Sequence, residues 1–301
     1  MLDLLSLIKQ KNLGEIKENQ DLRKYTTYRV GGIARYIILP DSEASLARIV
    51  EYCYDNHIKF NVIGHGSNVI VPNFAFDEPL IKLDRLDKII IRDDYFEVGS
   101  GYSLIKLALE LARKGISTLT FASGIPGSVG GSIFMNAGAY KEDISQHIIS
   151  VEVIDKEGKV STIMAEDMEF GYRQSLLKQR RDLVVVSAKF RIERKPVAEI
   201  LELIQDRRQR RLNAQPLKQP SAGSVFRNPF GEQAWRLIDE CGLRGESVGG
   251  AMVSDKHTNF IVNYDHATFE DITKLIEKVQ EKVKEERNIN LLLEQEIVDW
   301  K

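Results

Sequence analysis

Cysteine is scarce in this chain, and its scarcity excludes small proteins held together by disulfides or zinc. Only Cys53 and Cys241 occur among the 301 residues, and they form no C-x-x-C pair. The sequence therefore indicates neither a disulfide framework nor a zinc site, and we expect no metal. A reducing compartment fits this composition.

Long apolar runs are also missing. No stretch approaches the roughly 18 apolar residues of a membrane-spanning helix. The N-terminal segment MLDLLSLIKQKN alternates apolar and polar residues, and it lacks the basic region, apolar core and cleavage site of a signal peptide. We therefore expect a cytoplasmic protein without a membrane partner.

An excess of charge of one sign is a third absence. The 42 Lys and Arg residues nearly balance the 44 Asp and Glu residues, which gives a formal net charge of -2. A basic run at 207–211 lies on a predicted helix that also carries Glu199, Glu202 and Asp206. We interpret this run as a solvated face that could help to hold an anion, and we expect no nucleic-acid partner.

What is present is enough for a large core. The chain is 43% hydrophobic, and its length suggests about two domains at roughly 150 residues each. Apolar residues recur at helical spacing in 42–56 and 103–114. These two stripes consist of Leu46, Ile49, Val50 and Cys53, and of Leu104, Leu107, Ala108 and Leu111. Short β-branched runs predict strands at Tyr36–Leu39, Lys88–Ile91, Val151–Ile154 and Leu183–Val186. The first half is therefore α/β or α+β.

The composition changes near Glu193–Pro196, where we expect a domain boundary. A long polar helix follows over 197–212, with Ile200, Leu203 and Ile204 facing inward. After a polar loop at 213–229, the sequence predicts further helices and a terminal strand at 290–300. The helix near 268–287 has Thr268 as a candidate N-cap. Its apolar stripe consists of Ile272, Leu275, Ile276, Val279 and Val283.

Two loops are unusually rich in small residues. The first, 62–70, reads VIGHGSNVI and forms a turn between two strand-like runs; the second, 122–132, reads ASGIPGSVGGS and leads into NAGAY. Glycines let backbone N–H groups approach an anion closely, so two such loops suggest a diphosphate held between subdomains. Neither loop matches the P-loop or the Rossmann pattern. Ordinary tight turns remain the alternative interpretation.

Six motifs in a fixed order carry a resemblance to a known family. They are YTTYRVGG (25–32), GHGSN (64–68), GIPGSVGG (124–131), FGYRQS (170–175), SAGSVF (221–226) and LEQEI (293–297). This set, spread over about residues 20–300, resembles the UDP-N-acetylenolpyruvoylglucosamine reductase family of flavoenzymes. We see no insertion for the tyrosine-bearing loop of the family's longer form, so the chain is similar to the shorter form.

The resemblance implies an α+β fold with a two-subdomain FAD-binding region of the vanillyl-alcohol-oxidase (PCMH) type and a C-terminal α+β substrate-binding domain. The expected ranges are 1–82 and 83–195 for the two FAD-binding subdomains and 196–301 for the substrate-binding domain, whose terminal strand could pack back on the FAD region. FAD is expected to be noncovalent and to lie on backbone amides of both loops. The implied cofactor-binding residues are Tyr28, Arg29, Val30, Gly64, His65, Gly66, Ser67, Asn68, Gly124, Ile125, Pro126, Gly127, Ser128, Gly130 and Gly131. A covalent flavin tether at His65 is the alternative.

The implied reaction reduces UDP-N-acetylglucosamine enolpyruvate to UDP-N-acetylmuramate in peptidoglycan synthesis, and hence serves cell wall biogenesis, cell shape and cell division. NADPH is the implied hydride donor. The resemblance makes Ser224 the proton donor, with Arg173 and Glu296 stabilising the enolic intermediate. By the residues alone, Ser224 could be an ordinary loop serine. Glu294 shares a strand face with Glu296, so it remains an alternative.

The resemblance also places Arg227 and Asn228 at the UDP group of the substrate, although lysine is common in the family at position 227. The roles of Lys256, His257 and Asn259, and the oligomeric state, are open, with a monomer as the working expectation. An FAD-dependent sugar or alcohol oxidase of the same fold and a non-enzymatic nucleotide-binding module remain competing hypotheses.

Overall fold

The computed structural model describes residues 1–298, which divide into two compact units. The first unit contains 1–18, 35–65 and 77–208, and the second contains 19–34, 66–76 and the chain from 209 onward. The chain therefore passes repeatedly from one unit to the other. This division is coarser than the three expected domains, which remain a proposal. No helix formed by residues 1–298 is both long enough and apolar enough to cross a membrane.

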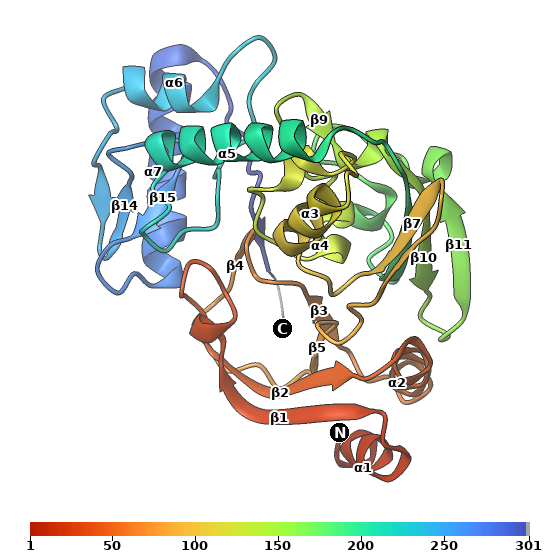
Figure 1. The fold of residues 1–301 in the computed structure, drawn as a ribbon. Coiled ribbons are helices and arrows are strands. Elements are labelled where there is room, and N and C mark those ends of the chain that lie inside the picture. Colours follow the sequence, from red (N-terminus) through yellow and green to blue (C-terminus); the bar gives the residue numbers. More distant parts are fainter. Residues whose placement is uncertain (299–301) are drawn as a thin grey trace. The chain divides into compact units, whose positions relative to one another are not determined.

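A four-stranded sheet with two helices forms one part of the first unit. Its order is β1 (Gly14–Asp21), β2 (Ile33–Pro40), β5 (Leu80–Lys82) and β3 (Asn61–Ile63), with β2, β5 and β3 parallel. Helices α1 (Leu2–Lys11) and α2 (Glu43–Asp55) pack with this sheet into one core. The predicted stripe of α2 is fully buried, and Ser42 caps the helix by accepting a hydrogen bond from the Ser45 amide. Figure 1 shows β1 and β2 as neighbouring strands at the red end of the chain.

A five-stranded antiparallel sheet forms the other part of the first unit. Its order is β11 (Val160–Met164), β10 (Ile148–Ile154), β12 (Val184–Arg191), β7 (Tyr95–Gly99) and β6 (Ile89–Ile91). Helices α3 (Leu104–Arg113) and α4 (Val129–Phe134) contribute to its core, and the predicted stripe of α3 is buried. Figure 1 shows α3 and α4 lying together in yellow. The smaller elements of this unit are β8 (Gly138–Ala139), β9 (Glu142–Asp143) and the 3₁₀ turns Thr120–Ala122, Ile144–Gln146, Ala165–Met168 and Leu176–Lys178.

Strand β12 separates two hydrophobic cores. Val184 and Val186 belong to the core of α1 and α2, whereas Val185, Ala188 and Phe190 belong to the core of α3. A strand that is buried on both faces needs a continuous apolar run, and this explains why the sequence shows no alternation here.

The second unit is built on helix α7 (Phe269–Arg287) and a three-stranded antiparallel meander of β13 (Ser247–Val248), β14 (Ala251–Val253) and β15 (Ile261–Asn263). Thr268 caps α7, as predicted, and exchanges hydrogen bonds with Asp271 in a capping box. All five residues of the predicted apolar stripe are buried. The same core includes Tyr28, Val30 and Ile70 from distant segments. The unit also contains α6 (Ala234–Glu240), the 3₁₀ turn Leu22–Lys24 and the parallel pair of β4 (Val69–Ile70) and β16 (Glu296–Ile297).

Two sequence predictions need correction. In helix α5 (Val197–Ala214), Ile200 and Ile204 pack with Ala112, but Leu203 is 38% exposed instead of facing inward. The contact of α5 with α3 is narrow. It covers only Ile200 and Ile204, which lie one helical turn apart on the same face.

The second correction concerns the predicted strand at 290–300. Its described part contains only the two strand residues of β16 and an isolated bridge at Leu293, because the partner strand β4 is itself two residues long. Residues 299–300 lie outside the described residues.

Candidate active site

The two glycine-rich loops meet within the first unit. Gly64 follows β3, and Ser128 lies in the second loop immediately before α4. A Cβ atom on Gly64 would lie 2.5 Å from the Oγ atom of Ser128, closer than real Cβ atoms approach. The two bends therefore lie side by side, as a shared diphosphate site requires.

Hydrogen bonds from three backbone amides hold the second loop in place. The Ser128 hydroxyl accepts from the Gly131 amide at 3.3 Å and so caps α4. The amide of Gly130 donates to the carbonyl of Ser100 at 2.8 Å, and the amide of Val129 donates to the carbonyl of Tyr102 at 2.9 Å. A Cβ atom on Gly130 would lie 2.9 Å from the Ser100 side chain, so glycine permits this close packing.

A buried lysine lies behind the first loop. The Nζ atom of Lys82 donates to the Gly64 carbonyl at 2.7 Å and lies 3.3 Å from Asp84. Burial lowers the pKa of Lys82, while the nearby Asp84 carboxylate opposes that shift. Within residues 1–298, the backbone amides of Gly64, His65 and Gly66 donate to no backbone carbonyl. This arrangement of amides and one positive charge suits an anion.

The imidazole of His65, which belongs to the first loop, reaches the second loop. Burial lowers the pKa of His65, whereas Asp84 and hydrogen bonds with the backbone of Gly101 and Gly127 raise it. Because Gly127 belongs to the second loop, this side chain helps to hold the loops together. A contact between His65 and the cofactor through its backbone remains a prediction.

The segment that begins at Tyr25 contacts the first loop in the second unit. Gly66 has a φ of +64°, and a Cβ atom there would lie 2.0 Å from the Tyr25 carbonyl oxygen. Tyr28 is fully buried, and its hydroxyl donates to the Oε1 atom of Gln295 at 3.1 Å. Val30 is buried too, so only Arg29 of the predicted trio has an exposed side chain. Tyr28 and Val30 can therefore offer a cofactor little besides their backbone.

Ser224 lies on a loop that is anchored on both sides. Before it, Gln295 donates from Nε2 to the carbonyls of Ala222 at 3.1 Å and Gly223 at 3.2 Å. After it, the Val225 amide donates to the Asn259 carbonyl at 2.9 Å. The serine side chain remains partly exposed between these anchors.

The terminal segment runs beside both the serine loop and the first glycine loop. The Glu294 amide donates to the Val225 carbonyl at 2.8 Å, and the Glu296 amide donates to the Asn68 carbonyl at 2.9 Å. The Asn68 side chain returns a hydrogen bond to the Glu294 carbonyl at 3.1 Å. The structure thus brings Ser224 and Glu296 into neighbouring segments. Since Glu294 and Glu296 are both partly buried, the choice of Glu296 stays a prediction.

Arg173 lies in the first unit, near the end of α4. Its φ is +57°, and its Nη2 atom donates to the Gly138 carbonyl at 3.0 Å. The guanidinium also lies over the Tyr172 ring at 5.0 Å from the centroid. The side chain of Asn136 donates to the carbonyl of Gly171 at 2.9 Å and so supports the turn that carries Arg173. The guanidinium is therefore held by contacts on more than one side.

The residues expected at the UDP group divide into two kinds. The Nε atom of Arg227 is buried and has no hydrogen-bond partner within residues 1–298, whereas Asn228 is exposed and accepts from the Ala234 amide at 3.1 Å.

Asn259 has a structural role, because its amide exchanges hydrogen bonds with both backbone groups of Phe226 at 2.8 and 2.9 Å. His257 packs on the ring of Phe260 at 4.9 Å, and burial lowers its pKa.

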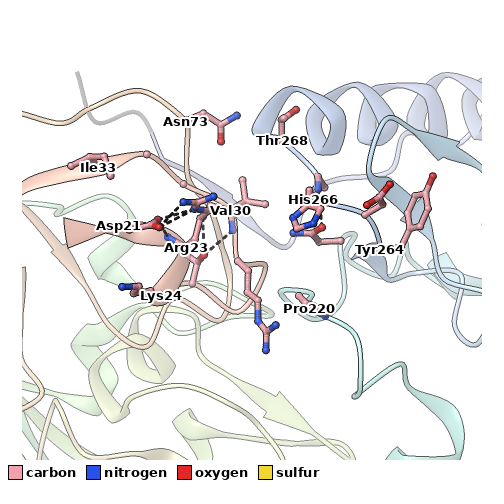
Figure 2. Close-up of a pocket in the computed structure, with 17 residues that line it drawn as sticks. Asp21, Arg23, Lys24, Val30, Ile33, Asn73, Pro220, Tyr264, His266 and Thr268 are labelled. Atoms are coloured by element: carbon pink, nitrogen blue, oxygen red, sulfur yellow. Dashed lines mark hydrogen bonds and ion pairs between the residues drawn. The ribbon is translucent and has the colours of Figure 1, made fainter. Parts of the chain in front are cut away.

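A pocket of about 980 Å³ lies in the second unit, between the segment around Val30 and the segment that leads into α7 (Figure 2). Figure 2 shows Arg23 paired with Asp21 on one side and His266 and Tyr264 on the other. Arg29 and Val30 are the predicted site residues in its lining, which does not include Ser224 or Glu296. Two predicted cofactor residues therefore border this pocket, and the predicted proton donor does not.

Comparisons with known proteins match both parts of the chain to families. An FAD binding domain family matches residues 34–163, and the UDP-N-acetylenolpyruvoylglucosamine reductase C-terminal domain family matches 215–298. The reductase of that name from Bacillus subtilis is 36% identical over 299 residues, which cover 99% of each chain. The one from Bacillus licheniformis is 37% identical over 98% of this chain and 97% of that protein. The chain belongs to the UDP-N-acetylenolpyruvoylglucosamine reductase family.

A solved structure extends the match to the fold. The crystal structure of the reductase from Thermus caldophilus has a TM-score of 0.80 and 34% identity, and the match covers 95% of this chain and 99% of that one. A chitooligosaccharide oxidase, with a TM-score of 0.50 and 15% identity, shares the fold alone. The expected α+β fold with an FAD-binding region is confirmed, and the chain is an FAD-dependent oxidoreductase. The nearly equal lengths fit the shorter form of the reductase family.

Reasoning from sequence found the motifs of the reductase family but missed their supports. Gln295 and Asn259 hold the backbone on either side of Ser224, and neither was assigned this task. The position of Gln295 within LEQEI was visible, but an amide between two acidic residues gives no signal of which carbonyls it will bind.

Proposed function

We propose that this chain catalyses the NADPH-dependent reduction of UDP-N-acetylglucosamine enolpyruvate to UDP-N-acetylmuramate in peptidoglycan synthesis. The observation that carries the proposal is the pairing of the serine loop with the terminal segment, through the hydrogen bond from the Glu294 amide to the Val225 carbonyl at 2.8 Å. This pairing supports the proposal, because it joins the loop of Ser224 to the segment of Glu296 in a chain of the reductase family.

The residues of the glycine loops fit FAD. The diphosphate is an anion. The first loop offers the amides of 64–66, which donate to no backbone carbonyl within residues 1–298, and the charge of Lys82 lies behind Gly64. Because Gly64 has no side chain, the second loop can approach it closely. We propose that residues 64–68 and 124–131 hold the cofactor noncovalently, mainly through their backbone, with the backbone of 28–30. When bound, FAD supplies the hydride transfer that links NADPH to the enolpyruvyl double bond.

Ser224 serves as the proton donor in this proposal. Hydride arrival at the terminal alkene carbon leaves carbanion character on the carbon next to the carboxylate, and this carbon then takes a proton from the Ser224 hydroxyl. A hydroxyl is a weak acid, but a nearly formed carbanion is a strong base, so a positioned serine suffices. A general acid contributes about 10²- to 10⁴-fold, which is roughly 3 to 5 kcal/mol of the barrier.

Arg173 and Glu296 stabilise the enolic intermediate. The planar guanidinium of Arg173 suits a carboxylate whose charge grows during the reaction. Glu296 contributes if it is protonated or paired with Arg173, since an ionised carboxylate alone would oppose the same charge.

Arg227 and Asn228 bind the UDP part of the substrate. The buried Nε atom of Arg227 lacks a partner within residues 1–298, and such a group is costly unless a ligand satisfies it. We further propose that the protein is a cytoplasmic monomer that takes NADPH and the sugar nucleotide, and no nucleic acid or membrane, as partners.

Substituting Ser224→Ala tests the proposal. Anaerobic NADPH should still bleach the flavin absorbance, because reduction needs no proton from Ser224. Reoxidation by the enolpyruvyl sugar nucleotide should slow by about 10²-fold or more. Stopped-flow absorbance measures both half-reactions, and Ser221→Ala, in the same loop, is the control.

Two results would contradict the proposal. Reoxidation of the Ser224→Ala enzyme at the normal rate would remove Ser224 as the acid. Hydrogen peroxide formation with a sugar alcohol, without NADPH consumption in the presence of the enolpyruvyl substrate, would instead support an oxidase.

A further inference from the structure

Gln295 is a buried amide that joins three segments of the second unit. The residue is 3% exposed. The Nε2 atom donates to the carbonyls of Ala222 and Gly223, and Oε1 accepts from the hydroxyl of Tyr28 at 3.1 Å. The next residue in the chain is Glu296. One side chain thus links the loop of Ser224, the segment of Tyr28 and the terminal segment.

These hydrogen bonds determine the orientation of the amide. A glutamine has two N–H donors on Nε2, and both face carbonyl acceptors here. The Tyr28 hydroxyl has no access to water, because the residue is fully buried, and its hydrogen bond to Oε1 distinguishes the oxygen end of the amide from the nitrogen end. Tyr28 therefore holds Gln295 in the orientation that binds the loop.

Ala222 and Val225 are buried in the core on either side, but the space beside Gly223 itself is open. Gly223 has a φ of +77°, and a Cβ atom there would meet nothing within 4 Å. Its carbonyl belongs to the peptide bond that joins Gly223 to Ser224. The hydrogen bond from Gln295 therefore restrains the peptide plane that directs Ser224, at a residue that has no side chain to hold it in place.

We propose that Gln295, held by Tyr28, is a positioning residue that orients Ser224 for proton delivery. The inference rests on the proposed function, because it takes Ser224 as the proton donor. Gln295 touches neither substrate nor cofactor in this account and acts only through the carbonyls before Ser224.

The experiment compares Gln295→Met with Gln280→Met in the FAD-loaded enzyme. Gln280 is a matched control, because its Nε2 atom also donates to a backbone carbonyl of the second unit, that of Leu291 at 2.8 Å, and it is not bonded to the serine loop. In Gln295→Met, reoxidation of the reduced flavin by the enolpyruvyl sugar nucleotide should slow by about 10- to 100-fold, since misplaced reacting groups cost rates of this order. Reduction by NADPH should keep its rate, and Gln280→Met should keep both.

A solvent isotope effect separates positioning from general damage. When proton delivery is impaired, reoxidation should slow further in D₂O, and this ratio should be larger for Gln295→Met than for the unchanged chain. Tyr28→Phe, which keeps the buried ring and removes only the hydroxyl, should show the same signature with a smaller, several-fold loss. It also carries the test if Gln295→Met does not fold or loses FAD.

The outcomes separate the inference from the function on which it rests. If the enolpyruvyl sugar nucleotide does not reoxidise the reduced flavin of the unchanged chain, the proposed function fails. If Ser224→Ala reoxidises at the normal rate, Ser224 is not the acid and the role of Gln295 falls with it. If Ser224→Ala is slow, while Gln295→Met matches Gln280→Met in rate and isotope effect, only the role of Gln295 is overturned. If Gln295→Met cannot be measured, a Tyr28→Phe enzyme with normal reoxidation overturns it equally.

Discussion

The two regions that carry the predicted site are built in different ways. In the first unit, the two glycine loops can approach each other because Gly64 has no side chain. A Cβ atom at Gly64 would lie only 2.5 Å from the Ser128 hydroxyl. In the second unit, the serine loop is held by the side-chain amides of Gln295 and Asn259. A surface that binds a cofactor through its backbone must let the cofactor come close to that backbone. A proton donor must instead be held in one orientation. The two means of construction match these two needs.

The largest effect is expected where a buried amide is lost. In Asn259→Ala, the amide and carbonyl of Phe226 both lose their partner in the core. The free energy of unfolding should fall by about 2 to 4 kcal/mol, because each unsatisfied buried group costs about 1 to 3 kcal/mol. Urea titration measures the change.

The control is Asn73→Ala in the same unit, where an exposed amide donates to Glu270 at 2.9 Å. It should change stability by no more than about 0.5 kcal/mol, as surface substitutions usually do. Equal losses in the two variants would show that burial of Asn259 does not matter.

A smaller effect is expected from filling the glycine contact. Gly64→Ala should destabilise the protein by about 1 to 3 kcal/mol, as overpacking does. Ser128→Ala alone should cost about 1 kcal/mol through the lost helix cap. In the double variant the clash is relieved, because the Ser128 Cβ atom lies at 3.6 Å, an ordinary contact distance.

The double variant should therefore be more stable than the sum of the two single losses predicts. It should also retain more FAD after gel filtration than Gly64→Ala does. Strict additivity of the two changes would mean that the loops are not in contact at this point.

The smallest effect concerns two histidines, one in each region. Burial lowers the pKa of both His65 and His257 below the ordinary 6.5. The unfolded chain therefore binds more protons than the folded chain just below pH 6.5, so stability is complete above that pH and declines as the pH falls through the folded pKa. Urea midpoints at about pH 8 and pH 5.5 measure this slope.

Each of the variants His65→Gln and His257→Gln should make the stability of the protein depend less on pH. The urea midpoints of the two variants should differ less at pH 8 than at pH 5.5. A slope that neither variant changes would assign the pH dependence to other groups. The comparison also shows which of the two regions is more sensitive to acid.

Local structure was largely predictable from sequence because periodicity and caps act over a few residues. The stripes of α2, α3 and α7 are buried as predicted, and Thr268 begins its helix with the predicted cap. Helix α1 was not among the predicted helices, although its buried residues Leu4, Leu5 and Ile8 lie at helical spacing. The exposure of Leu203 and the short strand β16 depended on how much surface the neighbouring elements offer.

The sequence by itself determined the family, the flavin chemistry and the positions of the loops, because glycines, small residues and motif order are properties of the chain alone. Only the tertiary structure decided that Gly64 meets Ser128 and that Gln295 joins Tyr28 to the loop of Ser224. A hydrogen bond of a buried amide depends on which distant backbone groups folding brings within about 3 Å, and spacing along the chain does not specify that partner.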